Sequence, residues 1–134
     1  MGTTSFTLRA VAETLSKEWR GGRQADGCVY IALGYEVSKD HGRLGHAVRG
    51  DGLLACPNGH HWQSLSRFTT NLDDARRLVP PGHDYLLQHV NGGLTISARV
   101  GDVESFGETD ELALVSASLL AWADIVDADR RAAA

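Results

Sequence analysis

The sequence predicts a single α+β domain over residues 1–134, in which helices cover a small antiparallel sheet and one helix lies near each end of the chain. Three observations lead to this prediction. A chain of 134 residues can bury one good core, whereas two domains of half this length would each bury too little. Apolar and polar residues alternate after Asn91-Gly92, which is typical of a β-hairpin. Apolar residues at helical spacing run through the C-terminal quarter of the chain.

A helix is predicted near the N-terminus because apolar residues recur there at spacings that place them on one helix face. The stripe consists of Leu8, Val11, Ala12, Leu15 and Trp19. We expect Ser5 or Thr7 to cap this helix and Gly21-Gly22 to end it.

The next part of the chain gives weaker signals. In the segment Asp26 to Gly34, Val29-Tyr30-Ile31 favours a strand, while Asp26 as a cap and Gly34 as a stop favour a short helix, so both remain open. Residues 36–66 are rich in glycine and contain four of the six histidines, with only short apolar pieces. We therefore expect an irregular segment there, without long regular elements.

Two further helices are expected to begin at capping residues. Thr70-Asn71 precedes a short helix that ends before Pro80-Pro81-Gly82. Its apolar residues are Leu72, Ala75, Leu78 and Val79. The long C-terminal helix begins after Thr109, with Asp110-Glu111 in its first turn and Arg130-Arg131 in its last, so charges at both ends match the helix dipole.

The hairpin between these two helices has the clearest pattern in the chain. One face of its second strand is apolar and consists of Leu94, Ile96, Ala98 and Val100. The other face carries Thr95, Ser97 and Arg99. The partner strand is Tyr85 to Val90, which is apolar on both sides, and Val103 to Phe106 is a candidate third strand.

Four stretches of this region resemble a known family. They are Phe68-Thr-Thr-Asn-Leu-Asp-Asp-Ala75, Leu78-Val-Pro-Pro-Gly82, Glu111-Leu-Ala-Leu and Ser118-Leu-Leu-Ala121. Together with the hairpin they are similar to the phage α/β/α sandwich domain family, small proteins of phages and prophages. Asp74 and Pro81 depart from the family pattern. The resemblance implies an α/β/α sandwich-like fold, a helix at Asp26 to Gly34, and a phage or prophage source. It implies no catalytic residues.

Composition narrows the functional classes. The net charge of -4 disfavours binding to duplex DNA, because no overall positive field attracts the phosphates. No apolar run is long enough to span a membrane and the first residues lack a signal-peptide pattern, so we expect a protein of the bacterial cytoplasm without a membrane partner. Cys28 and Cys56 are then expected to be thiols.

Metal and catalytic chemistry are both disfavoured. Cys56, His60 and His61 are residue types that zinc prefers, and Cys28 is a fourth candidate, but the spacing lacks paired ligand knuckles. We therefore assign no metal and no cofactor. No motif of a nucleophile elbow, zinc protease or phosphate loop is present, so we assign no catalytic residues. If the chain were an enzyme, histidine acting with a carboxylate such as Asp51 would be the expected chemistry.

Aromatic and cationic residues that suit a nucleotide remain as candidates. They are His60, His61, Trp62, Arg67, Arg76, Arg77 and Arg99. Rings stack on bases and guanidinium groups pair with phosphates, although Trp62 as a core residue and the arginines as a solvated face are simpler alternatives. By analogy with compact phage proteins, the sequence favours a non-enzymatic accessory binding protein that forms homo-oligomers and sequesters a nucleotide-derived immune signal. The alternatives are a protein-interaction or oligomerisation module and a small nucleotide-degrading hydrolase.

Overall fold

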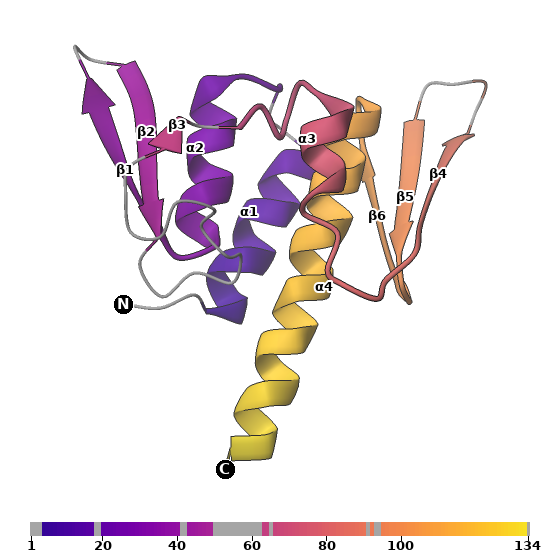
Figure 1. Ribbon diagram of the computed structural model, residues 1–134. Coiled ribbons are helices and arrows are strands. Elements are labelled where there is room, and N and C mark those ends of the chain that lie inside the picture. Colours follow the sequence, from indigo (N-terminus) through magenta and orange to yellow (C-terminus); the bar gives the residue numbers. More distant parts are fainter. Residues whose placement is uncertain are drawn as a thin grey trace.

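The computed structural model has the expected α+β class, with a helix at each end of the chain and antiparallel sheets (Figure 1). It describes residues 4–17, 20–40, 43–49, 63–64, 66–90, 92 and 95–133. Its helices are α1 (Ser5–Lys17), α2 (Arg23–Ala32), α3 (Leu72–Arg76) and α4 (Asp110–Ala133). Its strands are β1 (Tyr35–Asp40), β2 (Arg43–Arg49), β3 (Gln63–Ser64), β4 (Tyr85–Val90), β5 (Thr95–Val100) and β6 (Val103–Gly107). The prediction of an N-terminal helix and a long C-terminal helix is thus confirmed.

The helices lie between two three-stranded antiparallel sheets. One sheet has the order β1-β2-β3 and the other β4-β5-β6. Figure 1 shows α1 beside α4, the second sheet on the far side of α4, and the first sheet beyond α2, and the same neighbours are in contact. Because α4 covers one face of β4-β5-β6, the opposite face of that sheet carries exposed side chains such as Leu86 and Phe106.

Capping chemistry sets the ends of the helices. At α1 the cap is Thr4, whose Oγ1 accepts a hydrogen bond from the Thr7 amide at 3.2 Å. The expectation that Ser5 or Thr7 caps this helix is therefore wrong. Asn71 Oδ1 accepts from the Asp74 amide at α3, and Thr109 Oγ1 accepts from the Leu112 amide at α4. Both of these caps match the sequence prediction.

Residues 36–66 are more regular than predicted. β1 and β2 pair along their whole length from Tyr35–Arg49 to Asp40–Arg43, and β3 pairs with β2. The prediction of no long regular element is therefore wrong for the described part of this segment. The sequence of these strands does not predict them clearly. β2 contains a glycine, a residue depleted in strands, and charged residues in both strands leave only a short alternation of apolar residues. Of the two alternatives for the segment Asp26 to Gly34 the helix is observed, since α2 runs from Arg23 to Ala32, but it begins before Asp26, so the expectation of Asp26 as its cap is wrong.

The predicted hairpin is present as β4 and β5, with residues 91–94 between the paired strands. Tyr85 pairs with Val100 and Val90 with Thr95, and β6 follows on the other side of β5. Ile96, Ala98 and Val100 are buried against the helices. On the opposite face Arg99 is exposed, but Ser97 is buried between the side chains of the neighbouring strands.

Helix α4 contacts α1 and the sheet at once, and this requires its polar residues to find partners. Every residue from Leu112 to Leu119 is buried. Ser116 Oγ donates a hydrogen bond to the Ala12 carbonyl of α1 at 2.8 Å and lies 2.7 Å from Ser105 Oγ of β6. These bonds join α1, α4 and β6 inside the core, where an unpaired hydroxyl would be costly.

We expect Trp122→Phe to destabilise the fold by about 1–3 kcal/mol, because it leaves the Leu78 carbonyl without its buried donor. Trp122 Nε1 donates to Leu78 O at 2.7 Å and so connects α4 to the turn after α3. Urea denaturation followed by circular dichroism measures the change. Leu120→Phe, at a half-buried position of the same helix, is the comparison. Equal stability of Trp122→Phe and the wild type would contradict a role for this bond.

The contact between the start of α1 and the second half of α4 should depend on pH. Asp127 accepts a hydrogen bond from Ser5 and pairs with Arg9 Nη2 at 2.8 Å, and together they lower the pKa of the Asp127 carboxyl. A carboxyl with a lowered pKa in the folded state stabilises fully above its unfolded value of about 3.9 and loses this effect as the pH falls through the folded value. The stability difference between the wild type and Asp127→Asn should therefore shrink in urea titrations below about pH 4. A difference that stays constant down to acid pH would contradict it.

Candidate functional site

The predicted binding residues fall into three groups. Arg67, Arg76 and Arg77 lie in and around α3, and all three are exposed. Arg99 lies on β5, on the sheet face that α4 does not cover, with 61% of its side chain exposed. The remaining candidates are His60, His61 and Trp62, which lie outside the described residues, as do Asp51 and Cys56.

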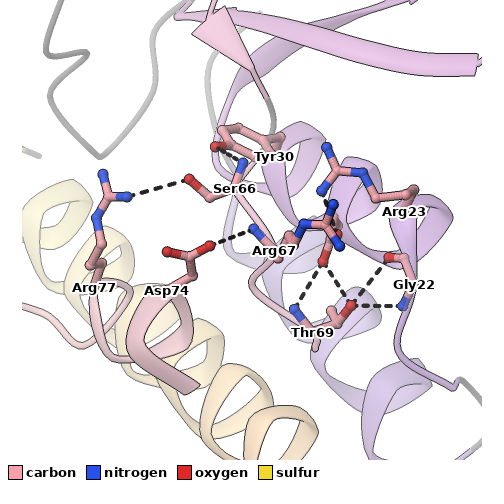
Figure 2. Close-up of polar contacts among 9 residues, drawn as sticks. Gly22, Arg23, Tyr30, Ser66, Arg67, Thr69, Asp74 and Arg77 are labelled. Atoms are coloured by element: carbon pink, nitrogen blue, oxygen red, sulfur yellow. Dashed lines mark hydrogen bonds and ion pairs between the residues drawn. The ribbon is translucent and has the colours of Figure 1, made fainter. Parts of the chain in front are cut away.

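A fully buried carboxylate, Asp26 of α2, holds the segment before α3 in place. Its Oδ1 accepts hydrogen bonds from the Thr69 amide at 2.9 Å and from Thr69 Oγ1 at 2.7 Å. Its Oδ2 pairs with Arg23 Nη1 at 3.1 Å (Figure 2). A buried charge is tolerable only when it is paired and hydrogen-bonded, and these three donors meet that need.

The Thr69 side chain also fixes the turn that leads into α2. Its Oγ1 accepts a hydrogen bond from the Gly22 amide at 2.9 Å. Gly21 lies so close to this segment that a Cβ atom there would meet the Thr69 carbonyl oxygen at 2.4 Å, so only glycine fits. Helix α1 ends at Lys17, before the Gly21-Gly22 pair that the sequence predicted as its end. Gly21 instead allows Thr69 to approach closely, and Gly22 donates its amide to the Thr69 side chain.

Arg67 and Arg77 are positioned by this locked segment. The Arg67 amide donates to Asp74 Oδ2 at 2.8 Å, and the Ser66 amide donates to the Tyr30 hydroxyl at 2.9 Å. Arg77 Nη1 lies 3.4 Å from Ser66 Oγ (Figure 2). The backbone of Arg67 is thus held by Asp74, the Arg77 guanidinium contacts Ser66, and both arginines are exposed.

Arg76 points elsewhere. It pairs with Asp73 of its own helix and is hydrogen-bonded to Tyr85 at the start of β4. The hydrogen bond with Tyr85 raises the pKa of the Arg76 guanidinium above its usual value, so Arg76 stays charged at any working pH. Tyr85, the first residue of the strand that the sequence predicted as apolar on both sides, is 39% exposed.

Tyr85 borders an open depression of about 450 Å³ beside Arg99. The depression is formed where the loop before β4 meets the turn between β5 and β6. Its lining residues are Gly82, His83, Asp84, Tyr85, Leu86, Arg99, Gly101 and Asp102. The Gly101 amide donates a hydrogen bond to the Asp84 carbonyl at 3.0 Å, which joins the loop before β4 to the turn after β5. Arg99 and Tyr85 thus both line the depression, while the register places their side chains on opposite faces of the sheet, since Arg99 pairs with Leu86 and Tyr85 with Val100.

The depression combines three kinds of recognition chemistry. Arg99 supplies a cation, only loosely paired with Glu104 at 3.8 Å. Leu86, which pairs with Arg99 and is 53% exposed, supplies an apolar surface on the same sheet face, and Asp84 and Asp102 supply acceptors for amino or hydroxyl groups. Sequence reasoning missed His83, Asp84 and Asp102, although these residues directly flank the predicted hairpin.

Cys28 is a free, half-buried thiol. Burial raises its pKa, which lowers the thiolate fraction at neutral pH and with it the reactivity of the sulfur.

Within the ranges that the structure describes, no three histidine, cysteine or carboxylate side chains lie together as a metal site would require. Over the same ranges, none of the helices is both long and apolar enough to cross a membrane.

We expect Thr69→Val to destabilise the protein by roughly 1.5–3 kcal/mol, because it removes a hydrogen bond to a buried carboxylate. Thr70→Val is the matched control, since Thr70 is the exposed neighbour of the same residue type. Chemical denaturation of both variants gives the comparison. If the two variants were equally stable, Asp26 would not depend on Thr69 for its partner.

The chain was also compared with known proteins. No protein-family model matches it, and neither a curated protein nor a solved structure with significant similarity was found.

Proposed function

We propose that the chain is a non-enzymatic binding protein whose ligand is a small nucleotide-like molecule in the depression beside Arg99. The observation that carries the proposal is the meeting of Arg99, Tyr85 and His83 around one depression of about 450 Å³. This volume lies within the range of about 300–1,000 Å³ that is usual for small-molecule sites. Arg76 adds a second cation next to Tyr85.

The charges around the depression restrict the ligand. Arg99 suits one phosphate group, since guanidinium pairs with phosphate oxygens by two hydrogen bonds. Asp84 and Asp102 would repel a ligand with several phosphates, but they accept hydrogen bonds from base amino groups or sugar hydroxyls. A base can pack on the exposed Leu86 side chain, which lies on the same sheet face as Arg99. A nucleoside monophosphate or a cyclic dinucleotide fits this pattern better than a triphosphate.

The environments of His83 and His89 favour binding over catalysis. His83 Nδ1 lies 3.4 Å from the Pro81 carbonyl oxygen, and His89 Nε2 lies 3.0 Å from Asp110 Oδ1. Neither contact joins a histidine to a nucleophile, which base-activated attack requires. In its finer form, and following the phage-family resemblance, the proposal is that a phage or prophage protein sequesters a nucleotide-derived immune signal.

We expect a panel of nucleoside monophosphates and cyclic dinucleotides to contain at least one ligand that raises the melting temperature by several degrees. Ligand at about 100 times its Kd stabilises the folded state by about 2.7 kcal/mol. Arg99→Gln should abolish the shift, whereas Arg130→Gln, an exposed arginine near the end of α4, should retain it. Differential scanning fluorimetry measures both.

Two outcomes would reject this proposal in different ways. No shift with any nucleotide, or equal shifts in the wild type and Arg99→Gln, would remove the depression as the binding site. Recovery of a cleaved product after heating the complex would assign the chain to the hydrolases instead.

The exposed face of β4-β5-β6 supports a second candidate, a protein-interaction module without a small ligand. Leu86 is 53% exposed and Phe106 is 45% exposed, and both lie on the face that α4 leaves uncovered. Large apolar side chains on one sheet face are typical of a surface that another protein covers.

A further inference from the structure

Strand β4 is an edge of its sheet and lacks the features that normally protect an edge. Within the described part of the chain its one strand neighbour is β5. Its sequence, Tyr-Leu-Leu-Gln-His-Val, contains no lysine, proline or carboxylate. Edge strands of monomeric proteins usually carry such residues, because free backbone groups would otherwise pair with another strand. We infer that β4 pairs antiparallel with β4 of a second copy of this chain, which joins two sheets into one of six strands.

The register of the hairpin determines which backbone groups are free. The Gly101 amide donates to the Asp84 carbonyl, so Asp84 and Gly101 form a hydrogen-bonded pair. Such pairs alternate with non-hydrogen-bonded pairs along an antiparallel ladder. Leu86, Gln88 and Val90 therefore direct their amides towards β5. Tyr85, Leu87 and His89 direct theirs away from the sheet, where the second copy would pair.

A second copy is the occupant that this edge fits best, because the edge is complementary to itself. A two-fold axis at Leu87 places Leu87 opposite its own equivalent and Tyr85 opposite His89 of the second copy, and each of these pairs exchanges two backbone hydrogen bonds. On the uncovered face, Leu86 then lies opposite Gln88 of the second copy. No two carboxylates or two basic groups meet, since the strand carries none apart from His89.

The exposed apolar residues are concentrated at this sheet. Of the large apolar side chains that the described residues expose, Tyr85, Leu86 and Phe106 lie in β4 and β6. Pairing the edges extends the surface around Leu86 across both copies. Because two short strands bury less than the roughly 1,200 Å² of a standard interface, we expect a concentration-dependent dimer with a Kd in about the micromolar range.

This inference is independent of the small ligand and gives the interaction module a partner, a second copy. The two proposals also fail separately. The ligand is tested by a thermal shift that needs Arg99, whereas the dimer is tested by its mass in the absence of any nucleotide.

Sedimentation equilibrium over a wide concentration range should show a monomer-dimer equilibrium for the wild type. His89→Pro should shift the protein to monomer, because it removes an amide that points away from β5 and leaves the hydrogen bonds of the hairpin intact. His89→Ala is the matched control, since it loses the same contact with Asp110 but keeps the amide, and it should remain dimeric. A wild type that is monomeric at every concentration, or a dimer that persists in a folded His89→Pro variant, would overturn the proposal.

Cross-linking tests the register and does not depend on how proline affects folding. In a chain whose native cysteines Cys28 and Cys56 are replaced by serine, Leu86→Cys and Gln88→Cys variants are prepared separately and mixed. Residues in a non-hydrogen-bonded pair have Cα atoms about 4.5 Å apart, which a disulfide can span. Mild oxidation of the mixture should give a disulfide-linked dimer containing one chain of each variant. Failure to form it, at concentrations where the wild type is dimeric, would reject pairing through β4.

Discussion

The position of α4 between α1 and the sheet β4-β5-β6 is the constraint on which the rest of the fold depends. A helix that is buried on two sides must use small residues where it meets its neighbours, and Ala113, Ser116 and Ala117 meet this need. At the sheet, a Cβ on Gly107 would meet the Ala113 amide nitrogen at 2.6 Å, so the strand end and the first turn of α4 are in direct backbone contact. Ser116 and its hydrogen bonds to α1 and β6 then fix how the three elements align.

Much of the periphery follows from this central packing. The Trp122 indole connects α4 to Leu78 after α3, and the segment before α3 is tied to α2 through Asp26. The arginines around α3 are therefore placed by two buried polar contacts rather than by α3 itself, which is only five residues long. A helix this short has little stability of its own, so contacts with the core determine the positions of its surface arginines.

Local patterns predicted most elements of the second half of the chain but not the first sheet. Thr109 and Asn71 cap helices as expected, and the alternation of β5 matches its burial except at Ser97. The pairing of β1 with β2 depends on contacts between strands whose own residues have weak strand propensity, and a single sequence does not reveal such contacts. The same limit applies to Asp26, where a capping role is the obvious interpretation and the actual partner, Thr69, lies 43 residues away.

The sequence predicted the cationic residue of the candidate site but did not predict the depression that it borders. Arg99 follows from the alternation of β5, whereas the depression requires the loop before β4 and the turn after β5 to close on each other. Tyr85 and Leu86 suggested a core strand because both are apolar, but β4 lies at the edge of the sheet, and position in the sheet decides exposure. Pattern alone does not distinguish a central strand from an edge strand when both faces are apolar.

The two proposals meet at the first residues of β4. Tyr85 is one of the residues that line the depression, and its backbone groups point to the free edge where the second copy would pair. Pairing would fix the Tyr85 backbone and so reduce the conformational entropy that a ligand must otherwise remove. A ligand in contact with Tyr85 would fix the same residue and favour pairing in return, because linkage between two binding events is reciprocal. A shared residue at the edge is thus sufficient to couple ligand binding to dimerisation, without any movement of the core around α4.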